Sequence, residues 1–118
     1  MTEVATKPTT HAPTTRPYEI EDSEMVAETS DLRVQLLTLA EGQSVPWHYH
    51  TRVNDVTFCL EGEIVIETRA PRATFRLKPG DRSDVPPKRA HTTKNVGAGR
   101  ARFLIVQGFG AFDFVPVG

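Results

Sequence analysis

Apolar and polar residues alternate in short runs from Tyr18 onward, and Gly and Pro residues separate these runs at close spacing. A period of two is typical of half-buried β-strands, and no stretch shows helical periodicity or a repeat of fixed length. We therefore predict ten strands, at residues 25–28, 32–40, 47–50, 55–60, 63–68, 74–78, 82–85, 91–95, 102–107 and 112–115. Ten short strands without a helix predict an all-β domain that closes as a barrel or packs as a sandwich.

Glycine and proline residues give the turns between these strands a stereochemical basis. Glu61-Gly62 joins two β-rich runs as a tight hairpin, because glycine adopts a positive φ without strain. Pro79-Gly80-Asp81 combines a fixed φ with a residue that tolerates a positive one. Pro86-Pro87 ends a strand, since neither residue can donate to a ladder of hydrogen bonds.

The segment before Tyr18 differs in composition from the rest of the chain. Residues 1–17 are rich in Thr and Pro and contain no apolar run. They predict an N-terminal arm, either flexible or lying on a partner subunit, that precedes one domain at residues 18–118. They contain neither a signal-peptide core nor a membrane span, so we expect a cytoplasmic protein without a membrane partner.

Charge and cysteine content narrow the functional classes. The 118 residues include 14 Lys and Arg against 15 Asp and Glu, for a net charge of -1, and the positive charges are not clustered. We therefore expect no binding to nucleic acid. Cys59 is the only cysteine, which excludes an intramolecular disulfide and argues against a zinc ribbon or a redox pair.

Three of the four histidines lie in the predicted β region, at positions 48, 50 and 91, while His11 lies in the arm. Residues two apart on a strand point to the same face, so His48 and His50 present their imidazoles side by side. Two such rings can share one metal ion, although a His-x-His pair alone is a weak signal.

The residues around these histidines strengthen the metal hypothesis, because their spacing resembles the two motifs of the cupin superfamily. The first motif, G-x5-H-x-H-x3,4-E-x6-G, is matched by Gly42, His48, His50, Asp55 and Gly62, with Asp in place of Glu. The second, G-x5-P-x-G-x2-H-x3-N, is matched by Gly80, Pro86, His91 and Asn95, with Lys88 in place of a Gly. The resemblance covers about residues 32–107 and implies a single-domain cupin fold, a double-stranded β-helix or jelly-roll barrel. The turn at Lys88 must either avoid a positive φ or accept some strain.

In cupins the two histidines, the carboxylate and the third histidine of these motifs converge on a metal inside the barrel. The resemblance implies that His48, His50, Asp55 and His91 bind one divalent metal ion in this chain. Three imidazoles and a carboxylate suit manganese, iron, nickel, zinc or copper, so the identity of the metal stays open. Because Asp is one methylene shorter than Glu, Asp55 either ligates directly or accepts a hydrogen bond beside a three-histidine site.

Strand parity points to further residues of the pocket. Counting in twos from Asp55 adds Thr57 and Cys59, and counting from His91 adds Thr93. We expect Cys59 to act as a small buried hydrophobe rather than as a nucleophile, since no histidine is left to activate it.

Three polar residues on other strands have two interpretations each. Gln107 ends an apolar strand, where it either hydrogen-bonds a metal-bound ligand or lies at the exposed strand end. Arg33 and Gln35 alternate with Val34 and Leu36, so they either line the mouth of the pocket or face solvent.

Apolar residues on the second face of one strand suggest a partner. Val56, Phe58 and Leu60 lie opposite the predicted pocket face, and the C-terminal run FGAFDFVPV is too apolar for a solvated tail. These segments either complete the sandwich of their own chain or are buried against a second subunit. We expect a homodimer.

The function predicted from these features is that of a metal-dependent enzyme acting on a small polar or carboxylated molecule, as cupin dioxygenases, isomerases, lyases and decarboxylases do. The alternative is a metal-dependent module that binds such a small-molecule ligand without turning it over. A third possibility, a barrel with a vestigial site, is opposed by the three intact histidines. The architecture alone does not determine the reaction.

Overall fold

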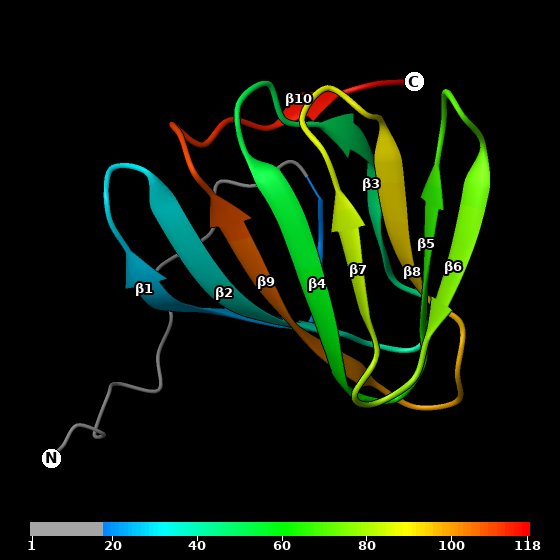
Figure 1. Cartoon of the computed structure of the whole chain (residues 1–118). Helices are drawn as coiled ribbons and strands as arrows, with labels where there is room; N and C mark the ends of the chain where they lie inside the picture. The colour runs from blue at the N-terminus through cyan, green and yellow to red at the C-terminus, as the bar shows by residue number, and fades with distance from the viewer. Residues whose placement is uncertain (1–17) are drawn as a thin grey trace, which may run out of the picture.

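Ten β-strands make up the regular structure of residues 18–118, the part of the chain that the computed structural model describes (Figure 1). The arm predicted for residues 1–17 lies outside the described residues. The strands are β1 (Asp22–Glu28), β2 (Leu32–Leu39), β3 (Ser44–Tyr49), β4 (Asn54–Glu61), β5 (Ile64–Thr68), β6 (Ala73–Leu77), β7 (Arg82–Val85), β8 (His91–Asn95), β9 (Ala101–Gly108) and β10 (Val115–Pro116).

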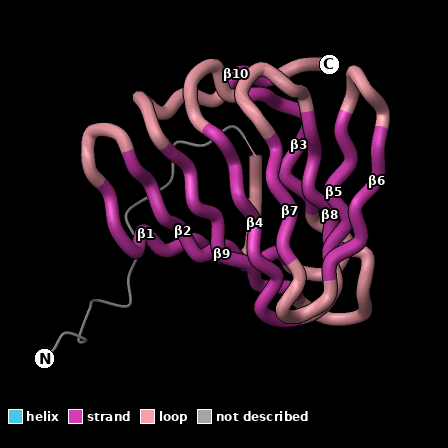
Figure 2. The backbone as a smooth tube through the Cα atoms, in the orientation of Figure 1, coloured by secondary structure: helices cyan, strands magenta, loops and turns pink. Residues whose placement is uncertain are grey.

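The strands form two antiparallel sheets that face each other (Figure 1). One sheet has the order β1-β2-β9-β4-β7 and the other β10-β3-β8-β5-β6, so strands distant in sequence become neighbours. This is the jelly-roll barrel predicted from the sequence, and the all-β fold class is confirmed. The described residues contain no helix (Figure 2), and therefore none that is long and apolar enough to cross a membrane.

Alternation along the strands places the core between the sheets. In β9 every second residue is buried, beginning with Ala101, Phe103 and Ile105. The opposing sheet contributes Ile64 and Ile66 from β5. Side chains on a strand alternate between the two faces, so the other half of β9 faces outward.

Three of the predicted strands are placed differently in the structure, and the first of them, predicted at residues 25–28, begins at Asp22. The strand predicted at residues 112–115 is wrong, because β10 comprises only Val115 and Pro116 and the two preceding phenylalanines pack on histidine rings instead of joining a sheet. The strand predicted at residues 47–50 begins earlier, at Ser44, and ends before His50. Its pairing with β8 shifts register between Val45 and His48, so both residues are buried although they are three positions apart.

The turn between β7 and β8 contains Lys88, at the position where the cupin motif has glycine. Lys88 has a φ of 71°, so of the two possibilities predicted from the sequence the turn takes the strained one. Its backbone N–H donates to the carbonyl of His50 over 2.7 Å. The turn thus holds the backbone at the end of β3.

Gly62 and Gly80 both have a positive φ, of 79° and 97°, but differ in their surroundings. A Cβ atom on Gly62 would lie 2.7 Å from the carbonyl oxygen of Arg100, whereas one on Gly80 would meet nothing within 4 Å. The hairpin at Gly62 therefore depends on glycine for space as well as for conformation.

The substitutions Gly80→Ala and Gly62→Ala separate these two requirements. We expect Gly80→Ala to lower the free energy of unfolding by about 1 kcal/mol, the cost of a left-handed conformation. Gly62→Ala adds the collision with Arg100, for a total loss of about 2–4 kcal/mol. Urea unfolding of both variants measures the difference, and equal losses would contradict the steric argument.

Candidate metal centre

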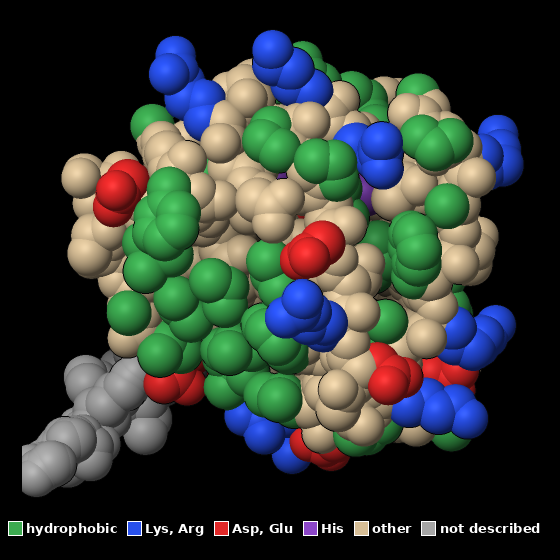
Figure 3. Space-filling view, viewed as in Figure 1, with side chains coloured by type: hydrophobic (Ala, Val, Ile, Leu, Met, Phe, Trp, Pro, Cys, Tyr) green, Lys and Arg blue, Asp and Glu red, His purple; other side chains and the backbone are tan. Residues whose placement is uncertain are grey.

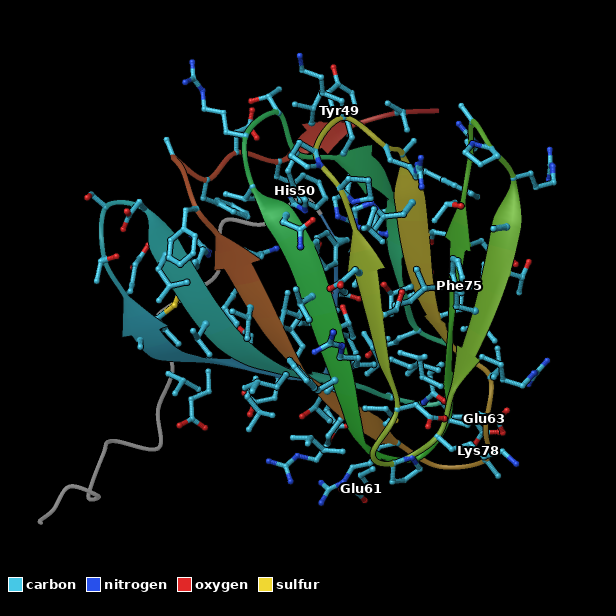
Figure 4. The ribbon with its side chains drawn as sticks, viewed as in Figure 1. Tyr49, His50, Glu61, Glu63, Phe75 and Lys78 are labelled. Atoms are coloured by element: carbon cyan, nitrogen blue, oxygen red, sulfur yellow. The ribbon has the colours of Figure 1, made fainter. Side chains whose placement is uncertain are left out.

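Four buried side chains meet inside the barrel near one of its ends. His48 comes from β3, His50 follows that strand, Asp55 lies on β4 and His91 on β8. Their potential ligand atoms all lie within 4.8 Å of one another, so they form a group that could hold one metal ion. In Figure 4 His50 lies at this end of the barrel, while the labelled Glu61, Glu63 and Lys78 lie at the opposite end.

The topology explains why residues so far apart in sequence meet. His48 and His91 are directly paired across the neighbouring strands β3 and β8 of one sheet. Asp55 points inward from the facing sheet, where it is paired with Gln107 on β9. The group therefore links the two sheets across the interior of the barrel.

Asp55 is the shared partner within this group. Its Oδ2 atom lies 3.0 Å from His50 Nε2 and 3.1 Å from His91 Nε2. The side-chain amide of Gln107 donates to the same oxygen over 3.5 Å. Asp55 Oδ1 and Gln107 Oε1 are buried and have no hydrogen-bond partner in the described structure. Buried acceptors without a partner are costly, and a bound cation and its ligands would satisfy them.

Each histidine of the group is oriented by a backbone carbonyl at its other ring nitrogen. The Nδ1 atoms of His48, His91 and His50 lie 2.7, 3.0 and 2.6 Å from the carbonyl oxygens of Pro46, Arg89 and Asp113. An Nδ1–H that donates to a carbonyl leaves the Nε2 lone pair available to a metal ion. All three imidazoles are therefore held in the orientation that a metal site requires.

Electrostatics favour a cation at this point. Burial and the charge of His91 lower the pKa of His48 to about 3, so this imidazole is neutral near pH 7. Burial opposes ionisation of Asp55, but the hydrogen bonds from His50 and His91 outweigh it and hold the pKa well below its usual range. Burial also opposes a charge on His50, yet its hydrogen bond to Asp55 raises the pKa of His50. A metal cation would therefore compete with a proton on His50.

The group borders a cavity of about 40 Å³. Of the pocket residues predicted by parity, Thr57 and Thr93 line this cavity, and so do Gln35 and Gln107. Gln107 is buried and directed at Asp55, and does not lie at an exposed strand end.

Two of the predicted pocket residues lie elsewhere. Cys59 is fully buried in the hydrophobic core, with its Sγ atom 3.5 Å from the carbonyl oxygen of Gly62. Burial raises the pKa of its thiol, which agrees with a packing role rather than a nucleophilic one. Arg33 does not line the cavity, and its guanidinium group lies over the ring of Phe112 at 4.0 Å from the ring centroid.

Three aromatic residues that border the cavity were not predicted from the sequence: Tyr18, Phe112 and Phe114. Phe114 stacks on His48 with ring centroids 4.3 Å apart, and Tyr18 stacks on Phe114 at 5.6 Å. Phe112 lies 5.3 Å from the ring of His50. The apolar C-terminal run signals that this segment is buried, but no spacing connects it with histidines more than 60 residues away.

The donor set fits a divalent transition metal. Three imidazoles and one carboxylate are neither the all-oxygen set of calcium and magnesium nor the thiolate set of a structural zinc site. A small all-β barrel with this group buried inside it is a jelly-roll protein that could hold a metal ion.

Comparison with known proteins identifies the family. The family model described as Cupin domain matches residues 35–107, more than half of the chain. The chain therefore belongs to the cupin family, which confirms the resemblance predicted from the motifs. It matches no curated protein sequence.

Solved structures share the fold at low sequence identity. Peruvianin-I, a cysteine peptidase from Thevetia peruviana latex, is similar with a TM-score of 0.74 and 24% identity over 87% of this chain and 72% of its own. A conserved protein with a double-stranded β-helix domain from Klebsiella pneumoniae has a TM-score of 0.70 and 23% identity over 90% of both chains. An oxalate oxidase has a TM-score of 0.72 and 18% identity over 92% of this chain and 60% of its own.

Proposed function

We propose that this chain is a metal-dependent enzyme that acts on a small polar or carboxylated molecule, with His48, His50, Asp55 and His91 as metal ligands. The observation that carries the proposal is the buried group itself, whose ligand atoms converge to within 4.8 Å beside a cavity. Surface acidic clusters often lack a metal, but three buried imidazoles around an ionised carboxylate are costly unless they serve a function.

The four ligands and the other residues that line the cavity would have different chemical roles. A divalent ion held by this group would act as a Lewis acid that orients substrate oxygens and stabilises developing negative charge. Gln107 offers a buried carbonyl oxygen without a partner, which can accept a hydrogen bond from a hydroxyl group or a water in the cavity. Thr57 and Thr93 also line the cavity, and their hydroxyl groups can donate to a ligand there. Tyr18, Phe112 and Phe114 add apolar surface to its lining.

The size of the cavity limits the ligand. A volume of about 40 Å³ holds roughly three water-sized groups, at about 10–15 Å³ each. The substrate, or the part of it that enters, is thus restricted to a few non-hydrogen atoms. Oxalate, which gives its name to an oxidase with the same fold, is among the smallest dicarboxylates and is therefore the first compound to test, although only part of it would fit the cavity as it stands.

A binding module is the second candidate, and one observation favours it. Among the described residues that line the cavity, the titratable side chains are the four members of the group and Tyr18. None of these described residues is a general base separate from the group, so among them proton transfer in an enzyme would fall to the ligand set, to Tyr18 or to a water. A protein that only captures a small carboxylate needs no such base.

We also propose that the chain forms a homodimer through the outer face of the sheet that contains β4. Paired positions across this sheet form a row, Glu24, Leu36, Leu104, Phe58 and Arg82, with an acid at one end and a base at the other. The next row contains Val34, Val106 and Val56. Figure 3 shows hydrophobic side chains gathered on this face over β2 and β9. A second copy related by a two-fold axis would cover the apolar centre of this face.

Metal binding is tested with the metal-free chain, His91→Ala and Thr93→Val. Manganese(II), nickel(II) or zinc(II) at about 100 times the dissociation constant should stabilise the wild type by about 2.7 kcal/mol. His91→Ala should lose this gain because it removes a ligand. Thr93→Val, a nearly isosteric change at another residue lining the cavity two positions along the same strand, should keep it. Chemical unfolding with and without metal measures the effect, and a wild type that none of these ions stabilises would contradict the metal site.

Turnover distinguishes the enzyme from the binding module. The metal-loaded protein is incubated with oxalate and other small mono- and dicarboxylates, and both bound ligand and new products are followed by NMR. If the protein is an enzyme, the wild type forms a product and His91→Ala forms none at a detectable rate. Binding of a carboxylate without any product would favour the module instead.

The dimer is tested with Leu104→Arg, which places a charge at the centre of the apolar row. Sedimentation should show a wild-type dimer and a monomeric variant, since a buried unpaired charge strongly opposes association. Val96→Arg is the control, because Val96 is an exposed apolar residue outside the rows. Circular dichroism checks that both variants are folded. A wild type that is monomeric at all concentrations would disprove the interface.

A further inference from the structure

The three imidazoles of the metal centre differ in how they are oriented. His48 and His91 each donate to the carbonyl oxygen of the residue two positions earlier, Pro46 and Arg89, so their own segments hold them. The acceptor for His50 is the carbonyl oxygen of Asp113, 63 positions away and only 2.6 Å from Nδ1. The orientation of His50 therefore depends on the C-terminal segment, defined here as residues 110–118.

Asp113 holds its segment against the residue that follows His50. Its carboxylate accepts hydrogen bonds from the backbone N–H of Thr51 over 2.8 Å and from the Thr51 hydroxyl over 2.6 Å. The bond from the hydroxyl holds the pKa of Asp113 below its usual range. One residue thus contacts two consecutive positions, with its carbonyl on the ring of His50 and its side chain on Thr51.

Backbone hydrogen bonds attach the segment on both sides of Asp113. Gly110 N–H donates to the carbonyl of Asp31 over 3.0 Å, and Val117 N–H donates to that of Trp47 over the same distance. Between them, Val115 pairs with Tyr49 in the β10–β3 ladder. Figure 1 shows the segment running across the end of the barrel at which β3 and β9 finish.

Aromatic contacts bring the same segment onto the ligand rings. Phe114 lies nearly parallel to His48, with an interplanar angle of 15°. Phe112 contacts both the ring of His50 and the guanidinium group of Arg33. Two of the three imidazoles are thereby held by a ring contact with the segment in addition to their hydrogen bonds.

We propose that the C-terminal segment is a positioning element of the metal centre, and that its docking and the binding of metal stabilise each other. The proposal rests on the metal site proposed above. His50 in its ligating orientation needs the Asp113 carbonyl, and a metal ion on His50 fixes the ring that this carbonyl contacts. Coupling between two binding events is reciprocal, so a change that loosens the segment weakens the metal, and metal tightens the segment.

The first experiment measures metal affinity in the full chain with cobalt(II), whose visible absorption reports ligand geometry. Asp113→Ala removes both bonds to Thr51 but keeps the backbone carbonyl, and should weaken cobalt binding about tenfold and alter the spectrum. Asp113→Asn should recover most of the affinity, since its amide can accept from the Thr51 N–H and donate to the Thr51 hydroxyl. Asp84→Ala, the same change at an outward-facing residue of β7, should bind cobalt as the wild type does.

The second experiment measures hydrogen exchange of the segment with and without cobalt. If the segment only stabilised the fold, its exchange would not depend on the metal. Cobalt(II) should slow exchange in peptides that contain Gly110 and Val117, and the slowing should be smaller in Asp113→Ala. An unchanged affinity and spectrum in Asp113→Ala, or exchange that does not respond to cobalt, would overturn the coupling alone. A wild type that binds no cobalt would overturn the coupling together with the metal site.

Discussion

The burial of Asp55 constrains the whole interior of the barrel. An ionised carboxylate between two sheets is strongly destabilising unless it has partners, and here His50 and His91 supply them from across the core. Because Asp55 belongs to one sheet and His91 to the other, the two sheets must keep their spacing for these bonds to form. One oxygen, Oδ1, has no hydrogen-bond partner among the described residues, and it is the natural point of attachment for a cation.

The fold could be predicted because it depends on local features of the sequence, and the group of four because its residues match the spacing of the two cupin motifs. Alternation with a period of two places Phe103 and Ile105 in the core, and glycine at positions 62 and 80 supplies the positive φ of two turns. The histidines lie at positions in the sequence where β3 and β8 pair near one end of the barrel. The short side chain of Asp55 did not prevent its carboxylate from reaching the histidines, which parity alone could not establish.

Other parts of the site could not be predicted, for two physical reasons. Counting residues in twos shows which face of a strand a side chain occupies, but not which end of the barrel it lies near. Cys59 therefore shares a face with Asp55 and yet lies in the hydrophobic core. Residues in segments without regular secondary structure follow no sequence period, so their contacts cannot be predicted from a pattern. The apolar pattern assigns Phe112 and Phe114 to a strand, whereas the structure uses them as ring contacts on the histidines.

The three aromatic residues that border the cavity have a kinetic consequence. Tyr18, Phe112 and Phe114 border a cavity of about 40 Å³, so a molecule larger than this space can reach the group of four only if side chains that border it move. For such a molecule, the rates of entry and release would depend on how often these side chains move, and they are separate from how tightly the site holds its occupant. If the group binds a metal ion, the rate at which a bulky chelator removes that ion would report on the motion of these side chains as well as on the strength of the bonds to the ion.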